Sequence, residues 1–136
     1  LNGYQKGKCF HCLTNISIFP NHADLADVDH FFPWKLKEYG VANPVDGVWN
    51  LVLACKGCNR GRGGKSARVP STKLLQRLKK RNDFLINSHH PLRETLIGQT
   101  GDSEPKRKSF LQKTYEEAKA ILIHEWEPEM TAGPIF

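Results

Sequence analysis

Two short apolar runs in the first half of the chain are predicted to be β-strands. Residues 28–32 combine a β-branched side chain with two aromatic ones and end at Pro33, and residues 48–54 form a longer, mainly apolar run. Such runs, bounded by Pro, Gly and Asn, are typical of strands. Between them, Pro33 suits the first turn of a short helix over residues 34–39, which Gly40 would end. We therefore expect strand, connection and strand, followed by a turn that contains cysteine.

The second half of the chain has the apolar spacing of helices. Ser71 is a suitable N-cap for a helix with leucines on one face and basic residues elsewhere. Further helices are expected over residues 91–97 and 105–126. The apolar faces of the first and last of these helices are formed by Leu74, Leu75, Leu78 and Leu85, and by Leu111, Tyr115, Ala118 and Leu122. The pattern predicts an α+β protein in two parts: residues 1–70, which contain the strands, and residues 71–136, a helical C-terminal extension packed on them.

Composition narrows the class of protein. A chain of 136 residues suffices for one domain with a modest core. It contains no apolar run near the ~20 residues that a membrane span requires, and no segment typical of a signal peptide. We therefore expect a soluble protein without membrane association and with a cytoplasmic location. Because the chain begins at Leu1 and its one methionine is Met130, we expect it to be a piece of a larger parent protein.

The positive charge is concentrated in one segment. The formal net charge is +6, and residues 56–81 contain ten Lys and Arg but no Asp or Glu. A block of one sign suggests a polyanionic partner, and a merely solubilising face is the alternative. The side chains expected to contact such a partner, nucleic acid in particular, are Arg60, Arg62, Lys65, Arg68, Lys73 and Arg77.

Four cysteines form two pairs, each with two residues between the sulfurs. These are Cys9 with Cys12, and Cys55 with Cys58. In a chain without a secretion signal, this spacing favours one tetrahedral structural Zn²⁺ over disulfides, a redox pair or buried thiols. His11 lies inside the first turn and, with four cysteines available, is expected to point outward. Zinc alone would indicate only how the chain folds, because many binding modules use the same arrangement.

The residues between and beside the cysteine pairs include candidates for catalysis. Asp29 and His30 are adjacent, so they can serve one site only near a strand end or bulge. Imidazole can activate water near neutral pH. Asp29 and the amide carbonyl of Asn59 offer hard oxygen ligands that suit Mg²⁺ or Mn²⁺. Taken singly these signals are weak, since an Asp-His pair usually lies at the surface or at a cap.

The order of these residues is more specific than any one of them. Asp29-His30-x-x-Pro33, then Asn50-Leu51, then Cys55-x-x-Cys58-Asn59 resembles the zinc-containing HNH endonucleases of the ββα-metal fold. Residues 27–33 and 59–62 are also similar to the HNH nuclease domain of CRISPR effector nucleases. The resemblance covers about residues 9–66, roughly half of the chain. It implies that residues 1–70 are an HNH nuclease core.

The resemblance also implies a role for each site residue. His30 would be the general base, Asp29 and Asn59 would hold the catalytic Mg²⁺ or Mn²⁺, and Asn50 would brace the loop that carries His30. The four cysteines would hold the structural Zn²⁺. Two positions depart from the family pattern. Asn59 stands where histidine is frequent, and a lysine that often follows is replaced by Arg62, with Lys65 beyond two glycines.

The function expected from this resemblance is a metal-dependent endonuclease that hydrolyses DNA phosphodiester bonds and leaves 5′-phosphate and 3′-hydroxyl ends. The alternative is a non-catalytic, zinc-stabilised module that binds nucleic acid. Asp29, His30 and Asn59 discriminate between the two, because a binding module would not require them. One such site cuts one strand, so cleavage of both strands would need a second site or a homodimer.

Overall fold

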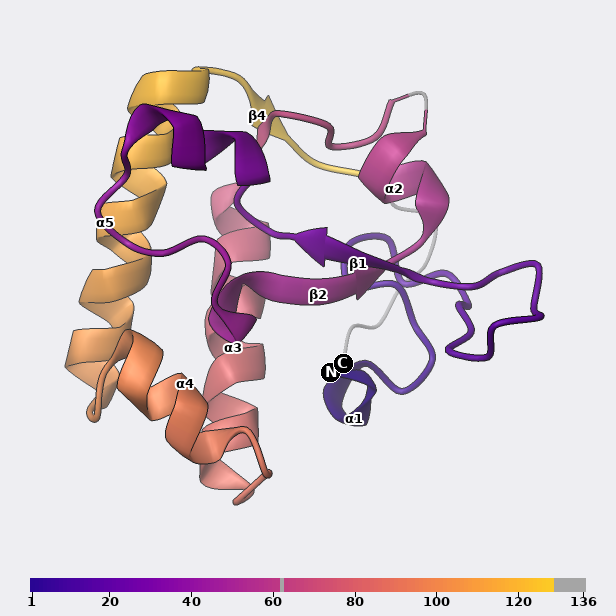
Figure 1. The fold of residues 1–136 in the computed structure, drawn as a ribbon, viewed down its shortest axis with the longest axis horizontal. Helices are drawn as coiled ribbons and strands as arrows, with labels where there is room; N and C mark the ends of the chain where they lie inside the picture. The colour runs from indigo at the N-terminus through magenta and orange to yellow at the C-terminus, as the bar shows by residue number, and fades with distance from the viewer. Residues whose placement is uncertain (62, 129–136) are drawn as a thin grey trace.

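The computed structural model describes residues 1–61 and 63–128. Their helices are short in the first half of the chain and longer in the second, and all of their strands are short (Figure 1). In chain order they are α1 (Asn2–Gln5), β1 (Asp27–His30), the 3₁₀ helix η1 (Trp34–Tyr39), the 3₁₀ helix η2 (Val48–Asn50), β2 (Leu51–Ala54), α2 (Lys56–Arg60), β3 (Val69–Pro70), α3 (Thr72–Asn87), α4 (Arg93–Thr100), α5 (Glu104–Leu122) and β4 (Glu125–Trp126).

The first half is organised around an antiparallel pair of strands. β1 pairs with β2 in a register that places Asp29 opposite Val52 and His30 opposite Leu51. The predicted helix over residues 34–39 is present as η1, and Gly40 ends it with a left-handed φ of 67°. The second predicted strand is shorter than expected because residues 48–50 form η2. There the side chain of Asn50, rather than a strand ladder, binds the backbone of Phe32.

The second half is helical, as the apolar spacing predicted. Ser71 caps α3, its hydroxyl accepting a hydrogen bond from the backbone N–H of Leu74 at 3.4 Å. The helix predicted over residues 91–97 is observed as α4, displaced toward the C-terminus. The last helix ends before Trp126, because Ile123 adopts a φ of 69° and the chain then extends. The extension β4 pairs in parallel with β3 and so returns the end of the described chain to the first half.

One hydrophobic core joins both halves of this mixed α and β structure. Aromatic side chains from the first half lie in one cluster with leucines and an alanine from α3 and α5: Phe10, Phe31, Phe32, Trp49, Leu74, Leu78, Leu85, Leu111 and Ala118. In the view of Figure 1, α2 lies above the β1–β2 ribbon and α1 below it. Among the described helices, none is long and apolar enough to cross a bilayer.

Arg81 is a structural side chain at the centre of this core. It is fully buried and donates hydrogen bonds to the carbonyl oxygens of Leu51 at 2.7 Å and Trp49 at 3.1 Å. Burial lowers the pKa of its guanidinium to about 10. The guanidinium therefore stays charged at neutral pH. Its hydrogen bonds to backbone carbonyls connect α3 to the start of β2. Part of the basic segment thus serves folding and not the surface.

Candidate functional site

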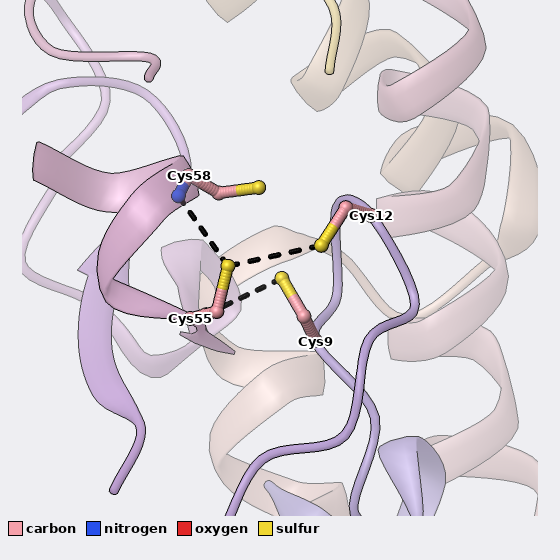
Figure 2. A group of neighbouring side chains, drawn as sticks. All are labelled: Cys9, Cys12, Cys55 and Cys58. Atoms are coloured by element: carbon pink, nitrogen blue, oxygen red, sulfur yellow. Dashed lines mark hydrogen bonds between the residues drawn. The ribbon is translucent and has the colours of Figure 1, made fainter. Parts of the chain in front are cut away.

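Four cysteine sulfurs from two distant segments meet in one cluster (Figure 2). Cys9 and Cys12 come from the loop after α1, and Cys55 and Cys58 from the end of β2 and the start of α2. All four sulfurs lie within 4.8 Å of one another, and the sulfurs of Cys12 and Cys55 are 3.7 Å apart. A tetrahedron with zinc–sulfur bonds of about 2.3 Å has edges of about 3.8 Å. The cluster can therefore hold a metal ion such as zinc, as the cysteine spacing predicted.

Backbone hydrogen bonds hold the two cysteine turns at this distance. The N–H of Phe10 donates to the carbonyl of Leu53 at 3.0 Å, which fastens the first turn to β2. The sulfur of Cys55 caps α2 by accepting from the N–H of Cys58 at 3.4 Å. A hydrogen bond between the Cys58 and Cys12 sulfurs raises the pKa of Cys58 and lowers the pKa of Cys12. A divalent cation bound by all four thiolates would displace the thiol protons and leave the cluster with a formal charge of about −2.

His11 was expected to point outward, and that prediction is wrong. Its side chain is 0% exposed, and its Nε2 lies 2.9 Å from Oδ2 of Asp29. Burial lowers the pKa of the imidazole, although Asp29 opposes the shift. The neutral ring donates its Nε2–H to the carboxylate. It is held between its own turn, Phe31 and Trp126, whose rings pack around it. The first cysteine turn is therefore joined directly to the candidate catalytic aspartate.

Lys65 was expected to contact DNA, and instead it holds the other oxygen of Asp29. Its side chain is 2% exposed, with Nζ 3.1 Å from Oδ1 of Asp29 and 2.9 Å from the carbonyl oxygen of His30. Burial lowers the pKa of the ammonium, and Asp29 acts against that shift. Gly64 allows this placement, since a Cβ there would lie 2.4 Å from the carbonyl oxygen of Gly57. The glycine-rich loop after α2 thus folds back and delivers Lys65 to Asp29.

The three proposed reaction residues line one open pocket of about 320 Å³. Asp29 and His30 come from β1 and Asn59 from α2, so the hairpin and the helix after it assemble the pocket. His30 ends β1, which is why it can share a site with its neighbour Asp29 despite the alternation of a strand. Asp29 is 3% exposed and lies at the floor, whereas His30 is partly exposed. Trp34 and Lys65 are also part of its lining.

His30 and Asn59 each have a carboxylate neighbour. Nε2 of His30 lies 3.2 Å from Oδ1 of Asp46, and Nζ of Lys37 lies 2.5 Å from the other oxygen of Asp46. Nδ2 of Asn59 donates to Oδ2 of Asp27 at 3.0 Å. Because the nitrogen of the Asn59 amide donates to Asp27, its oxygen Oδ1 is left as the acceptor of this side chain. An Nε2–H bond to Asp46 likewise leaves the lone pair of the His30 ring on Nδ1.

Asn50 is buried and braces the segment that follows His30, as the resemblance implied. Its Oδ1 accepts from the N–H of Phe32 at 2.8 Å, and its Nδ2 donates to the carbonyl oxygens of Phe32 at 3.0 Å and Val45 at 2.8 Å. The amide oxygen and the amide nitrogen of Asn50 thus both bind backbone groups. Asn50 therefore fixes the end of β1 relative to the loop before η2, and it does not line the pocket described above.

The other described residues predicted to contact DNA differ in exposure and in their partners. Arg77 is 5% exposed and donates to the carbonyl oxygens of Phe10 at 2.6 Å and His11 at 2.9 Å, so it supports the first cysteine turn. Arg60 is 63% exposed and contacts Asp27. Arg68 is half-buried and donates to the carbonyl of Gly64. Lys73 is exposed. Arg62 lies outside the described residues.

Three residues of this site had no role in the sequence prediction. His11 lies inside a cysteine turn and Asp46 lies in a loop 16 residues from its partner, so no local pattern indicated either contact. Asp27 alternates with Asp29 along β1, and that period of two places both carboxylates on one face of the strand. The alternation was the available signal that Asp27 would meet α2.

Comparisons with protein-family models, with curated proteins and with solved structures find no match for this chain.

Proposed function

We propose that this chain is a metal-dependent HNH-type endonuclease that hydrolyses phosphodiester bonds of DNA. The observation that carries the proposal is the convergence of Asp29, His30 and Asn59 in one open pocket. The antiparallel strand pair followed by α2 is the order of elements expected of a ββα-metal core, and the resemblance of the residue order to HNH endonucleases points the same way. A module that only binds nucleic acid would have no need of these three side chains together.

His30 is proposed as the general base. An Nε2–H bond to Asp46 fixes the ring and its tautomer, so that Nδ1 can accept the proton of an attacking water. The partial exposure of the ring leaves room for that water and for a phosphate. Asp46 stabilises the imidazolium formed after proton transfer, as a carboxylate does for a catalytic histidine.

Asp29 and Asn59 are proposed to hold a catalytic Mg²⁺ or Mn²⁺. Their oxygens are hard donors, and only two protein ligands would leave most of the coordination shell to water and phosphate, as Mg²⁺ favours. Each oxygen of Asp29 already accepts one hydrogen bond, and each has further lone-pair capacity. The ion, when bound, would neutralise charge on the scissile phosphate and on the leaving oxygen. The donor set therefore fits such an ion.

The cysteine cluster is proposed to hold a structural Zn²⁺ that positions this pocket. Cys58 precedes Asn59 directly, and the carbonyl of Cys58 accepts from the N–H of Lys65 at 2.6 Å. His11, which lies in the other cysteine turn, is hydrogen-bonded to Asp29. Of the two proposed metal ligands, Asn59 is thus bonded directly to a cysteine of the cluster, and Asp29 is linked to the other cysteine turn through His11.

Nicking of a supercoiled plasmid tests the proposed function. The purified, zinc-loaded protein should convert supercoiled DNA to open circles when Mg²⁺ or Mn²⁺ is added, and not in its absence. Binding of DNA should be measured in parallel. Protein that binds DNA but never nicks it, with either ion, would support the alternative of a non-catalytic nucleic-acid-binding module.

The His11 contact gives a further prediction for this site. His11→Phe keeps an aromatic ring in the core but removes the donor to Asp29, so the carboxylate should lose its fixed orientation. Loss of a partner that orients a metal ligand typically costs about 10- to 100-fold in metal affinity or activity. The Mg²⁺ concentration for half-maximal nicking should therefore rise by at least about 10-fold, while zinc content stays at one per chain.

His124→Phe is the matched control, because His124 is exposed and its described hydrogen bonds are made by its backbone. It should nick DNA with the Mg²⁺ requirement of the wild type. An unchanged Mg²⁺ requirement in His11→Phe would show that the hydrogen bond does not orient Asp29 for metal binding.

A further inference from the structure

A second concave surface lies apart from the candidate site, between α1 and α3. Two adjoining hollows of about 430 and 340 Å³ share Tyr4 and Lys80 in their walls. We call this surface the α1–α3 groove; its walls include Tyr4, Lys6, Lys73, Lys80, Asp83 and Phe84. None of these residues lines the pocket of His30. The groove is thus lined by α1 and α3, whereas the pocket of His30 is lined from β1, α2 and the segments that follow them.

The charge of the groove is strongly positive. Among the described lining residues, the basic ones outnumber the one carboxylate, Asp83. That carboxylate is already paired with Lys79 at 2.7 Å and with Arg107 at 2.9 Å. Lys6, Lys73 and Lys80 are exposed, and within the described residues no carboxylate lies at ion-pair distance from them. Lysines that are clustered without acidic partners favour a polyanionic ligand.

An aromatic pair forms one wall of the groove. The ring of Phe84 packs on the ring of Tyr4 with their centroids 5.3 Å apart and their planes at 53°. Phe84 is nevertheless 43% exposed, although it is a large apolar side chain on a charged helix. Part of its ring surface is therefore open to a ligand, beside the lysines. Aromatic rings beside a basic groove are how proteins bind unpaired bases, which stack on the ring while the phosphates meet the cations.

We infer that the α1–α3 groove binds a single-stranded stretch of nucleic acid, with a base stacked on Phe84 and phosphates at Lys73 and Lys80. A duplex keeps its bases stacked inside and offers nothing to the ring. An acidic peptide would satisfy the lysines but leave the ring exposed. The choice of DNA as the nucleic acid rests on the proposed function. The groove would then hold an unpaired strand at a surface apart from the pocket in which His30 is proposed to cut DNA.

Binding of a fluorescent oligothymidylate without Mg²⁺ tests the groove in the absence of cleavage. Removing two phosphate contacts in the double variant Lys73→Gln/Lys80→Gln should make the log–log salt dependence shallower by about 1.4, since each single-strand contact contributes about 0.7. Phe84→Leu keeps apolar bulk but removes the ring, so it should weaken oligothymidylate binding by roughly 10-fold or more. Its binding to a blunt duplex of equal length should be unchanged.

Two exposed lysines of α5 supply the matched control, Lys108→Gln/Lys113→Gln, which removes equal charge outside the groove. It should bind the oligonucleotide as the wild type does. Melting temperatures of all variants should be measured to confirm that they are folded. Wild-type binding by both groove variants would overturn the inference, as would equal weakening in the α5 control. Displacement of the oligonucleotide by polyglutamate as efficiently as by unlabelled oligothymidylate would assign the groove to an acidic peptide and overturn it too.

These outcomes are separate from those of the nicking assay. Protein that binds the strand through this groove but fails to nick DNA would overturn the proposed function and leave the groove inference standing. Nicking by the wild type, together with unchanged strand binding by the groove variants, would overturn the groove inference alone.

Discussion

His30→Ala should reduce Mg²⁺-dependent nicking by about 10² to 10⁴-fold, the usual cost of losing a general base. The imidazole is the proton acceptor of the proposed reaction, and its ring is partly exposed and held by Asp46. Removing it leaves the hydrogen bond from Lys65 to the His30 backbone carbonyl, which does not depend on the side chain. The measurement is the initial rate of open-circle formation at saturating Mg²⁺.

Zinc content and melting temperature of His30→Ala should match those of the wild type, because the side chain is partly exposed and its described hydrogen bond is to the exposed Asp46. His124→Ala removes an exposed imidazole elsewhere and should keep full activity. Turnover of the purified His30→Ala protein within a few-fold of wild type would rule out the assignment of His30 as the base.

Loss of the proposed structural Zn²⁺ is the second change with a large expected effect. Cys58→Ser, or removal of zinc by a strong chelator, should abolish nicking that added Mg²⁺ cannot restore, and should lower the melting temperature. Structural zinc sites contribute on the order of 10 kcal/mol of apparent binding free energy, which is coupled to folding. Here the cysteine turns also position Asp29 through His11 and Asn59 through its neighbour Cys58. The expected loss is therefore of both stability and activity.

Asn59→Ala separates the scaffold from the chemistry. The residue is a proposed Mg²⁺ ligand whose other described side-chain contact is a part-buried hydrogen bond to Asp27 at 3.0 Å. Its removal should cost only about 1 kcal/mol of stability, the net contribution of one hydrogen bond, while it cuts Mg²⁺-dependent nicking strongly. If Cys58→Ser retained both its melting temperature and its Mg²⁺-dependent cleavage, the proposal that one metal positions the ligands of the other would fail.

The sequence alone was sufficient for the local features. Proline and glycine at fixed positions determine where η1 begins and ends, because each restricts or relaxes φ at its own residue. Ser71 caps α3 through its own hydroxyl. The two Cys-x-x-Cys spacings predicted that four sulfurs would converge, and they do. These features depend on neighbours within a few residues, so the chain order contains the information.

Only the tertiary structure decided which charged side chains are exposed. Lys65, Arg77 and Arg81 belong to a basic segment that reads as one surface, and yet all three are buried. Each is buried because a partner distant in sequence accepts its hydrogen bonds: Asp29 for Lys65, backbone carbonyls for the arginines. His11 is buried for the same reason. The periodicity of a single sequence does not identify partners that are distant along the chain. A charged side chain can be buried only where such a partner accepts its hydrogen bonds or carries the opposite charge.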